Sequence, residues 1–586
     1  MTETILKMQK KVKRYLDKDR YDHTIGVMHT AGCLAMRYGA NLEQALTAGL
    51  LHDCAKCVPA DEKIKLCEKN HIEISDAENK NPGLLHAKLG AFFAREKYGI
   101  ENEEILRSIE SHTTGRPNMS LLDKIIYIAD YIEPGRDVAP NLPEVRALAF
   151  VDIDACLYRI LEDTLAYLAE KGATLDPATE ETFLYYKNLN QQEVKKCIEL
   201  AEDQHYIRRE LTKRRLIAFV ANGSILPRES GVSQKPMKGA IAFEAPESME
   251  VEMELPHRGK IKGMGIPEGI TLIVGGGYHG KSTLLKALEQ GIYNHVAGDG
   301  REYVITSDTA MKIRAEDGRC VSHINISPFI NDLPNHKDTH SFYSEDASGS
   351  TSQAANVIEA LETGSHLLLI DEDTSATNFM IRDELMQRVV NRNQEPITPF
   401  IERVQWLSDT QGISSILVAG SSGSYFHVAD TILQMDHYKP VDITAFAKKE
   451  AEAFPSIQPS APAGAVADYR RVIQPDPAFR PDRRLKMKVL GMDSISVNHD
   501  TIDLRCLEQL ADQEQIQALS AILCYAERRL FNGKDTLQQI IDRLDTELSG
   551  RGLEILSEGG RLAPNLAMPR IQEVYACINR YRGLKI

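Results

Sequence analysis

A strand–loop–helix pattern at residues 269–289, GITLIVGGGYHGKSTLLKALE, constrains the fold of this chain more than any other feature. A short apolar, β-branched run predicts a buried strand, the glycines that follow predict a tight loop, and a helical pattern begins at Lys281. A buried strand that feeds directly into a helix is typical of a layered α/β sheet. Similar apolar strands recur at HLLLIDED and SSILVAGSS, so residues 215–445 are predicted to be α/β.

The loop in this pattern matches the full phosphate-binding sequence Gly-x-x-x-x-Gly-Lys-Ser. Backbone N–H groups of such a loop close around phosphate oxygens, helped by the N-terminus of the helix that follows. Lys281 is predicted to reach the β- and γ-phosphates, and Ser282 to ligate Mg²⁺. The residues predicted to bind ATP at this loop are Gly275, Gly277, Gly280, Lys281, Ser282 and Thr283.

An acidic pair ends the strand HLLLIDED, at Asp371 and Glu372. Asp371 is predicted to support Mg²⁺, and Glu372 is the natural base for the water that attacks ATP. A pair of acidic residues that only caps a helix is the alternative. Both residues are therefore included in the predicted ATP site, with Glu372 in a catalytic role.

Small residues open a predicted helix between these two motifs, at Ser348, Gly349 and Ser350. A plain helix cap explains such residues equally well when they stand alone. Here they precede Asp371, and DTSAT follows that residue, which is where ATPases of the ABC type carry a signature motif and a D-loop. In those ATPases the signature binds the γ-phosphate held by the other protomer, which implies an ATP-dependent homodimer.

Residues 200–586 resemble the soluble family described as predicted ATPases of the ABC class. The resemblance is strongest in ELPHRGKIKGMGIPEGITLIVGGGYHGKSTLL and DASGSTSQAANVIEALE. That family has its own region ahead of LIAFVANGSILPR, and here a different domain replaces much of it. No histidine follows SSILVAG directly, so His427 would act as a switch only if its loop folds back; Ser421 or Ser422 is the alternative.

The first 190 residues are predicted to be almost entirely helical. Histidines and aspartates recur through this helical region, at helix ends or on apolar faces. Neutral imidazoles and carboxylates suit Fe, Mn or Zn, and adjacent His and Asp residues let one carboxylate bridge two ions. The sequence therefore predicts a dinuclear metal centre whose ligands are His23, His52, Asp53, His86, His112 and Asp130.

Cys54 and Cys57 offer a competing interpretation of the same stretch, GLLHDCAKC, as a redox or zinc pair. A structural zinc site needs four ligands, and no second cysteine pair lies nearby in the sequence. The dinuclear metal interpretation is therefore favoured. A further alternative treats the metal site as degenerate and purely structural, although all six ligand types are present.

Residues 15–190 resemble the HD-domain phosphohydrolases, and closely the YqeK-type symmetrical diadenosine tetraphosphate hydrolases. The most distinctive part is HTTGRPNMSLLDKIIYIADYIEPGRD. The resemblance implies that one iron is held by His23, His52, Asp53 and Asp130, and the other by His86 and His112 with Asp53 bridging. It implies catalytic roles for Asp53 and Lys56, polyphosphate binding by Lys56, Arg116 and Arg136, and release of two ADP.

The chain has 586 residues, too many for one hydrophobic core, so several domains are expected. The predicted divisions are a metal-dependent phosphohydrolase domain, a P-loop ATPase core, a Pro/Ala-rich linker and a mostly helical end, at residues 1–195, 196–450, 451–484 and 485–586. The fold class is thus an all-α HD domain followed by an α/β ABC-type ATPase.

Composition limits the partners and the compartment. Ten cysteines lie scattered without a disulfide framework, the N-terminus has no secretory pattern, and no apolar run is long enough to cross a membrane. We therefore expect a cytoplasmic protein without membrane segments. A net charge of −15 argues against non-specific binding of nucleic acid by the whole molecule.

Two functional hypotheses follow. The first is a bifunctional enzyme that cleaves diadenosine tetraphosphate and hydrolyses ATP. The second is an ATP-gated module that binds RNA or ribonucleoprotein, with the metal domain as an accessory. Basic clusters at residues 208–215 and 480–488 are the only sequence support for RNA, and they lack interleaved aromatic residues.

Overall fold

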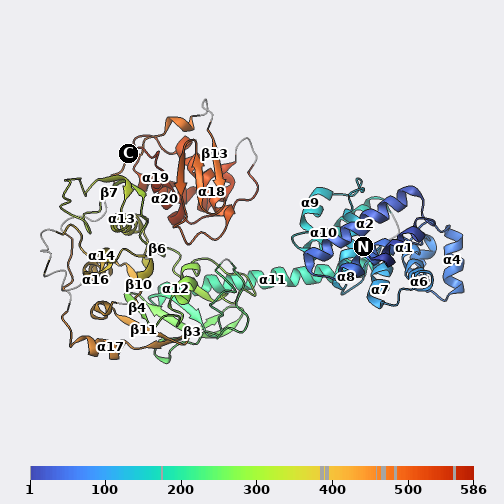
Figure 1. The fold of residues 1–586 in the computed structure, drawn as a ribbon, viewed down its shortest axis with the longest axis horizontal. Coiled ribbons are helices and arrows are strands. Elements are labelled where there is room, and N and C mark those ends of the chain that lie inside the picture. Colours follow the sequence, from blue (N-terminus) through green and yellow to red (C-terminus); the bar gives the residue numbers. More distant parts are fainter. Residues whose placement is uncertain are drawn as a thin grey trace. The chain divides into compact units, whose positions relative to one another are not determined.

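The computed structural model describes residues 2–172, 176–231, 233–382, 389, 395–420, 422–456, 458–462, 470–480, 485–557 and 562–586. Contacts divide the chain into two compact units, Met1–Lys196 and Cys197–Ile586 (Figure 1). No helix among the described residues is long and apolar enough to cross a membrane.

Helices account for the regular structure of the described part of the first unit. Polar caps fix several of them: Asp17, Asn41 and Asn102 accept backbone N–H groups of the first turn, and Ser120 forms a capping box. The helices are α1 (Glu3–Val12), α2 (Lys18–Tyr38), α3 (Leu42–Leu51), α4 (Ala60–Lys69), α5 (Asp76–Lys80), α6 (His86–Tyr98), α7 (Glu103–Ser111), α8 (Leu121–Ile132), α9 (Leu142–Leu148) and α10 (Ile153–Glu170).

The core of this unit lies where α2, α3, α8 and α10 pack together, with Val27, Leu50, Ile128 and Leu157 fully buried. One apolar face of α10 contributes Leu157, Ile160 and Leu161 to that core. Burial of these apolar faces holds α2, α3 and α8 in fixed relation, and the predicted metal ligands lie on or beside the same helices.

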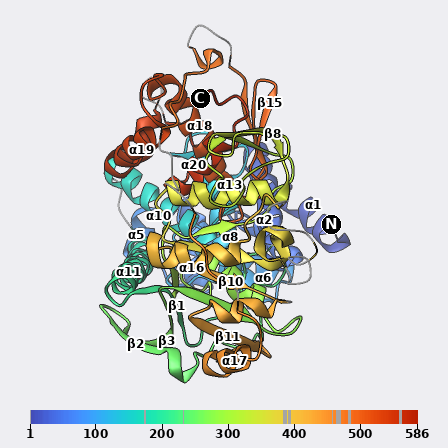
Figure 2. The ribbon, with the colours of Figure 1, turned by 90° about the vertical axis from the view of Figure 1, so that its left-hand side faces the viewer.

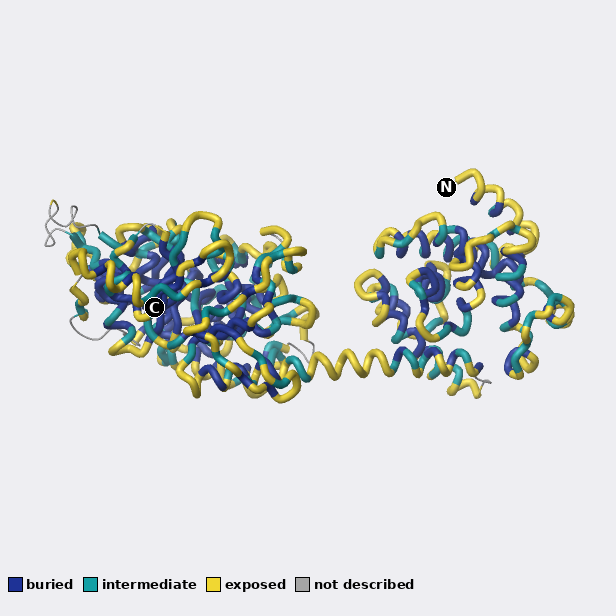
Figure 3. The backbone as a smooth tube through the Cα atoms, turned by 90° about the horizontal axis from the view of Figure 1, so that it is seen from below, coloured by how far each residue is buried: buried dark blue, intermediate teal, exposed yellow. Residues whose placement is uncertain are grey.

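Helix α11 (Pro177–Lys213) carries the boundary between the units. Tyr186 belongs to the core of the first unit, whereas Ile207 and Leu211 belong to a cluster in the second. Residues 188–198 between them are exposed, which Figure 3 shows as a continuous exposed stretch of helix. The predicted boundary between the first two domains, at residues 195 and 196, therefore lies within this exposed part of the helix.

The second unit is built on a six-stranded sheet with the order β12-β11-β4-β10-β9-β6. Neighbouring strands run parallel except for β12, which forms an antiparallel hairpin with β11. The strands are β4 (Ile270–Val274), β6 (Met311–Ile313), β9 (Leu367–Asp371), β10 (Ser414–Val418), β11 (Thr431–Asp436) and β12 (Lys439–Asp442).

Helices cover both faces of this sheet, as expected for strands that are apolar throughout. Leu367 and Leu369 of β9 pack in one cluster with α12 (Lys281–Gln290). Leu368 and Ile370 pack in another with α13 (Gly349–Glu362) and α16 (Phe400–Gln411), which Figure 2 shows on one side of the sheet. The predicted multidomain fold, helical first and then α/β, is confirmed.

Smaller elements complete the core of the second unit. An antiparallel sheet has the order β2-β3-β1-β5, and a separate hairpin pairs β7 with β8. The bounds are β1 (Leu216–Ala221), β2 (Glu250–Leu255), β3 (Gly259–Pro267), β5 (Val304–Thr306), β7 (Arg319–Ile324) and β8 (Phe342–Ala347). The short helices are η1 (Glu247–Met249), η2 (Glu372–Thr374), α14 (Thr377–Met380), η4 (Gly423–His427) and α17 (Thr444–Ala451).

The C-terminal part combines helices with a three-stranded antiparallel sheet that the sequence interpretation did not include. Its elements are η5 (Pro477–Phe479), β13 (Met487–Leu490), β14 (Ser494–Val497), β15 (Asp500–Asp503), α18 (Gln513–Arg529), α19 (Leu537–Arg551), η6 (Gly552–Leu556) and α20 (Ile571–Asn579). Within the predicted linker, Ile473 and Phe479 are buried in this part, so residues 470–480 are packed. Residues 457, 463–469 and 481–484 of that linker lie outside the described residues.

Candidate metal centre and nucleotide-binding loop

The six predicted metal ligands come from different helices but lie around one point of the first unit. His23 is on α2, His52 and Asp53 follow α3, and His86 begins α6. His112 follows α7, and Asp130 is on α8. All but His23 and Asp130 are buried. The structure therefore brings together every ligand that the sequence predicts.

The carboxylate of Asp53 divides the histidines into two groups. Its Oδ2 atom lies 3.5 Å from Nε2 of His52 and 3.8 Å from Nε2 of His23. Its Oδ1 atom lies 3.2 Å from Nε2 of His86 and 3.7 Å from Nε2 of His112. Each oxygen of one carboxylate thus faces a separate pair of imidazoles.

Asp130 completes the first of these groups. Its Oδ1 atom lies 3.0 Å from Nε2 of His23 and 3.8 Å from Nε2 of His52. Ligand atoms at such separations can surround an ion whose bonds to nitrogen and oxygen are about 2.0–2.2 Å long. The grouping of His23, His52, Asp53 and Asp130 is the one that the resemblance implies for one metal.

Each histidine is held through its Nδ1 atom. His52, His86 and His112 use Nδ1 to bind the backbone carbonyl three residues earlier, at Gly49, Gly83 and Ile109, over 2.7–2.8 Å. Since a carbonyl only accepts, Nδ1 carries the proton and Nε2 keeps its lone pair. Nε2 is also the atom that faces the centre, so the rings are oriented as neutral metal ligands.

The electrostatics of the centre fit a cation. Nε2 of His86 and Nε2 of His112 are 3.1 Å apart, and two lone pairs at that distance repel each other. Among the described residues, the buried atoms Nε2 of His23, Nε2 of His52 and Oδ1 of Asp53 make no hydrogen bond. Buried polar atoms without partners are costly, and bound metal ions would satisfy them.

The protonation states of His86 and Asp53 also favour metal binding. Burial lowers the pKa of His86 to about 4, so this imidazole is neutral at neutral pH. Burial alone would raise the pKa of Asp53, but the electrostatic influence of His52 and the other imidazoles around its carboxylate holds that pKa well below its usual range. A neutral imidazole and an ionised carboxylate are the forms that bind metals.

Two of the three predicted phosphate-binding cations border the centre. Nζ of Lys56 lies 3.1 Å from Nε2 of His86, and a guanidinium nitrogen of Arg136 lies 3.2 Å from Oδ1 of Asp130. Arg116 instead forms an ion pair with the buried Asp123 and donates to the carbonyl oxygen of Asn118. The side chain of Arg116 therefore contacts the segment just before α8 and the first turn of that helix. Its role in binding phosphate remains a prediction.

Sequence reasoning missed two residues of the centre. Arg20 donates to Oδ2 of Asp53 over 2.9 Å. The buried Glu133 lies 3.1 Å from Nδ1 of His23, which lacks the backbone carbonyl partner of the other histidines. Both residues lie three positions from a predicted ligand within a helical pattern, Arg20 before His23 and Glu133 after Asp130, and that spacing is the signal that could have identified them.

The cysteine interpretation fails on geometry. Cys54 is buried with its Sγ atom 3.5 Å from the carbonyl oxygen of Gly90, whereas Cys57 is exposed and lies 3.3 Å from the carboxylate of Asp17. Burial raises the pKa of the Cys54 thiol to about 12, so it is not a ready thiolate. The two thiols have different surroundings and do not form a shared site.

The phosphate-binding loop of the second unit joins β4 to α12 at the carboxyl edge of the parallel sheet. Gly275 and Gly280 have φ values of 141° and 97°, which favour glycine. Nζ of Lys281 donates to the carbonyl oxygens of Gly275 and Gly276 over 2.7 and 2.9 Å. The ammonium group of Lys281 thus lies over the loop, at the place where the sequence predicts that it meets phosphate.

Asp371 and Glu372 lie at the same edge, because β10 separates β9 from β4 and all three strands run parallel. Burial raises the pKa of Asp371, and Oε2 of Glu372 accepts the backbone N–H of Gly420 over 2.6 Å. These contacts fix the acidic pair opposite the end of β10. The arrangement is consistent with the predicted Mg²⁺ and base roles, which stay predictions.

The signature candidate opens α13, with Ser348 as an exposed N-cap whose side chain makes no capping hydrogen bond. Gln353 on this helix is buried and accepts the backbone N–H of Ala376, in the segment that follows the acidic pair, over 2.8 Å. His427 ends η4 and is half-buried, Ser422 caps η4, and Ser421 lies outside the described residues. A hydrogen bond thus connects α13, which begins at the signature candidate, to the segment that follows Asp371 and Glu372.

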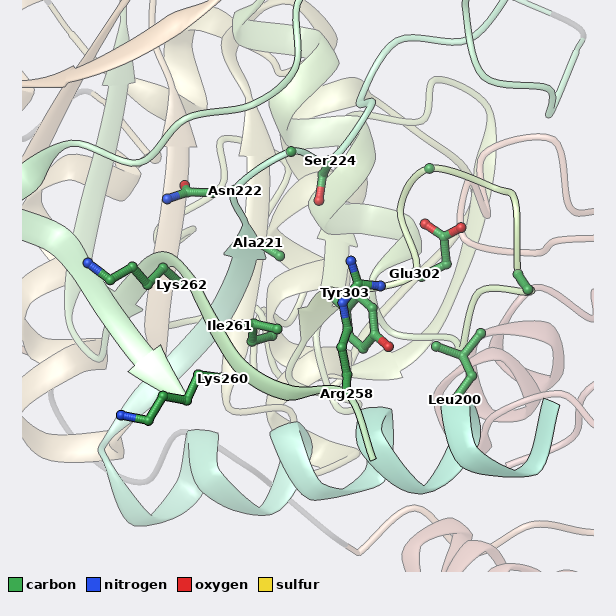
Figure 4. Close-up of a pocket in the computed structure, with 13 residues that line it drawn as sticks. Leu200, Ala221, Asn222, Ser224, Arg258, Lys260, Ile261, Lys262, Glu302 and Tyr303 are labelled. Carbon is green, nitrogen blue, oxygen red and sulfur yellow. The ribbon is translucent and has the colours of Figure 1, made fainter. Parts of the chain in front are cut away.

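The first basic cluster is largely engaged within the protein. Arg208 donates to the backbone carbonyl of Thr306, Arg214 pairs with Glu210, and Arg215 pairs with Glu268. Part of the second cluster, residues 481–484, lies outside the described residues. A cavity of about 720 Å³ beside β1 and β3 carries Arg258, Lys260 and Lys262 (Figure 4), and no predicted site residue lines it.

Comparison with known proteins gives three family matches. Residues 20–135 match the HD domain, residues 190–470 match the ABC ATPase P-loop domain, and residues 486–586 match the MRB1590 C-terminal domain. These matches cover the metal centre, the nucleotide-binding loop and the C-terminal part in turn.

Individual relatives each match only part of this chain. A Bacillus subtilis protein named symmetrical bis(5'-nucleosyl)-tetraphosphatase is 41% identical over 175 residues, which cover 30% of this chain and 91% of that protein. A crystal structure of a predicted HD superfamily hydrolase from Clostridium acetobutylicum has 42% identity, covers 31% of this chain and 96% of that one, and gives a TM-score of 0.30. The uncharacterized protein MJ1628 of Methanocaldococcus jannaschii is 32% identical over 257 residues, which cover 42% of this chain and 56% of that protein.

Proposed function

Because the chain belongs, through its first unit, to the family of symmetrical bis(5'-nucleosyl)-tetraphosphatases, we propose that this unit hydrolyses diadenosine tetraphosphate to two ADP at a dinuclear metal centre. The arrangement around Asp53 carries the proposal, since each carboxylate oxygen faces two imidazole Nε2 atoms. One bridging carboxylate with two ligand groups matches two ions and not one. Iron is the metal expected from the family, with Mn or Zn as alternatives.

A metal pair bound here would acidify water toward hydroxide and neutralise charge on the phosphoryl oxygens. The protein's own residues supply orientation and further charge. Lys56 and Arg136 border the ligands and can bind phosphate oxygens, and Arg20 adds a third cation beside Asp53. Water adds to an inner phosphorus, the central P–O bond breaks, and the departing oxygen takes a proton, so that two ADP form.

Product analysis tests this proposal. Purified protein is analysed for metal content and incubated with diadenosine tetraphosphate, and the nucleotides are separated by chromatography. We expect about two metal ions per chain and ADP alone as the product. Formation of ATP and AMP would show asymmetric cleavage, and an inactive protein with a full metal complement would leave the centre structural.

For the second unit, we propose that the loop at Lys281 binds Mg-ATP and that Glu372 activates water for its hydrolysis. The support is the strand–loop–helix at β4 and α12, with the acidic pair at the same sheet edge. The loop residues Gly276, Gly277 and Ser282 are exposed, so one chain does not enclose a nucleotide there. Ser348 of a second copy would cover it, which makes ATP a link between two protomers.

Trapping the dimer tests this second proposal. Replacing Glu372 with Gln removes the base and leaves phosphate binding intact, so Mg-ATP accumulates unhydrolysed. Light scattering after size exclusion should show a dimer with Mg-ATP and a monomer with Mg-ADP. A monomer under both conditions would contradict the dimer, and ATP turnover equal to the unmodified protein would remove Glu372 as the base.

A further inference from the structure

The connection between β6 and β7, residues 314–318, lies directly against the signature candidate that opens α13. The backbone N–H of Glu316 donates to Oγ of Ser352, near the start of that helix, over 2.9 Å. The backbone N–H of Gly318 donates to the carbonyl oxygen of Ala347, the last residue before the candidate, over 2.9 Å. Hydrogen bonds on both sides of the signature candidate therefore fix it to this connection.

The same connection also contacts the segment that follows the acidic pair. The backbone N–H of Ala315 donates to the carbonyl oxygen of Thr374 over 3.0 Å. Thr374 ends η2, which begins at Glu372. The β6–β7 connection thus contacts both parts of the predicted ATP site. Under the proposed function the acidic pair serves the nucleotide of its own protomer, and the signature candidate serves that of the other protomer.

A buried arginine of the C-terminal part holds the connection in place. Arg580 follows α20, which contacts α13 (Figure 2). Its Nε atom donates to one carboxylate oxygen of Glu316 over 3.1 Å, and a terminal nitrogen binds the other oxygen and Oδ1 of Asn356 on α13. Nδ2 of Asn356 donates to the same carboxylate over 2.9 Å. One guanidinium thus links the connection, the signature helix and the C-terminal part.

The charges of this cluster balance one another. Arg580 and Glu316 are 5% and 8% exposed, and beside them the buried Arg319 pairs with the buried Glu359 of α13. Burial alone would raise the pKa of Glu316, but the two guanidiniums lower it to about 2. A buried ion pair adds little net stability relative to apolar residues, whereas its charged, directional contacts permit few arrangements. The cluster is therefore better suited to fixing one geometry than to stabilising the fold.

A second buried ion pair ties the far end of α13 to the same part of the chain. Arg471, in the packed residues 470–480, pairs with Glu362, the last residue of α13. The Arg471 guanidinium also donates to Oδ1 of Asn579 on α20 over 2.8 Å. The signature helix therefore cannot shift along its axis without breaking buried contacts with the C-terminal part.

We propose that Arg580 is a positioning residue for ATP hydrolysis. Through Glu316 it fixes the start of α13, so that Ser348 meets the nucleotide of the other protomer in the correct place. The inference rests on the proposed function of the second unit and deepens it. The C-terminal part is then needed for ATP turnover, although it carries none of the residues that the sequence predicts to bind ATP.

Variants of the full chain separate positioning from simple packing. Arg580→Met leaves the Glu316 carboxylate buried without that partner, so this variant alone should lose stability. Glu316→Gln combined with Arg580→Met removes both charges and keeps the pair of Arg319 and Glu359. Arg543→Met is the matched control, because this arginine of the C-terminal part forms its ion pair within that part.

We expect the double variant to bind Mg-ATP within about twofold of the unmodified chain and to unfold at a similar temperature. Its ATP turnover should fall about tenfold, because a misplaced signature slows the reaction without weakening binding. Calorimetry, thermal unfolding and an ATPase assay measure these quantities, and Arg543→Met should be normal in all three. Normal turnover in the double variant would overturn the positioning role, and so would a parallel loss of ATP binding.

A mixing experiment shows through which part of the site Arg580 acts. The double variant keeps its own phosphate-binding loop, and Lys281→Ala keeps its own signature. Mixing the two should restore about a quarter of normal turnover, because half of randomly formed dimers contain one intact site. No recovery would overturn the action through α13 and would assign the defect to the acidic segment of the same protomer.

Failure of the proposed shared site looks different. Ser348→Arg mixed with Lys281→Ala serves as the reference, since its defect lies in the signature itself. If the reference mixture recovers turnover and the mixture with the Arg580 double variant does not, only the inference fails. If neither mixture recovers, the shared site proposed for the second unit fails, and the role of Arg580 fails with it.

Discussion

The two sites of this molecule are built in opposite ways. The metal centre gathers ligands from α2, α6, α8 and the ends of α3 and α7, and most of them are buried within one chain. The phosphate-binding loop is one continuous segment between β4 and α12, and several of its residues are exposed. The first site is thus largely closed by its own fold, whereas the second is open to solvent at several of its residues.

This difference shows which contacts fix the side-chain geometry of each site. In the centre, backbone carbonyls hold three of the imidazoles, so the helix packing fixes the ligand geometry before any ion binds. In the loop, Lys281 donates to the carbonyl oxygens of Gly275 and Gly276, which belong to the same short segment. The centre is preorganised, whereas under the proposed function the loop would be completed by nucleotide and by a second copy of the chain.

The largest expected effect comes from the bridging position. Asp53→Ala should lower diadenosine tetraphosphate cleavage by about a thousandfold or more and empty both metal positions, because one carboxylate serves both ligand groups. ATP turnover should not change. Metal analysis, product chromatography and an ATPase assay measure the three quantities, and Asp61→Ala on the exposed face of α4 is the matched control. Loss of ATP turnover as well would break the independence of the two sites.

Lys281→Ala should do the reverse, lowering ATP turnover by roughly several hundredfold because the cation that meets the β- and γ-phosphates is gone. Cleavage of diadenosine tetraphosphate should be unchanged. The exposed Lys286 on the same helix gives the matched control, Lys286→Ala, in the same assays. A parallel loss of dinucleotide cleavage would mean that ATP controls the metal centre.

A smaller effect sharpens the contrast between a closed and an open site. Ser348→Arg should leave ATP binding within about twofold but lower turnover roughly tenfold to a hundredfold, since the signature acts on the other protomer's nucleotide. Mixing it with Lys281→Ala should restore about a quarter of normal turnover, because half of randomly formed dimers contain one intact site. The ATPase rate of the mixture measures this. No recovery on mixing would contradict a shared site.

The smallest effect concerns orientation within the centre. Glu133→Gln should lower metal affinity and dinucleotide cleavage about tenfold, because the neutral amide holds His23 less firmly than the carboxylate does. Titration with Fe²⁺ or Mn²⁺ gives the affinity, and the thermal midpoint without metal shows whether folding is affected. Glu144→Gln, on the exposed side of α9, is the control. An unchanged metal affinity would reduce Glu133 to a packing residue against Gly26.

The fold was largely predictable because its signals are local. The spacing of apolar residues along the chain predicts helix for α10 and strand for β4, β9 and β10. The sheet of β13, β14 and β15 was missed, since four-residue strands leave too short a pattern to separate from helix. The burial of Ile473 and Phe479 within the predicted linker was missed because its Pro-rich composition resembles that of a linker even where single residues are packed.

The sequence identified the residues of the two candidate sites to different extents. The loop motif names its residues outright, because one short segment makes the phosphate contacts. The ligands of the centre could be named by residue type and by resemblance. Arg20 and Glu133 were not named, because a spacing of three residues from a predicted ligand is common among charged residues on helices and does not by itself show what they face.

The sequence by itself determined which functional groups are present. They are imidazoles and carboxylates in the first unit, and a glycine loop with a lysine and an acidic pair at a strand end in the second. Only the tertiary structure decided which atoms meet. The packing of the helices places the two oxygens of Asp53 toward different histidines and Glu133 beside Nδ1 of His23. The physical reason is that residue identity fixes charge and donor atoms, whereas contacts between distant segments depend on how whole helices and sheets pack.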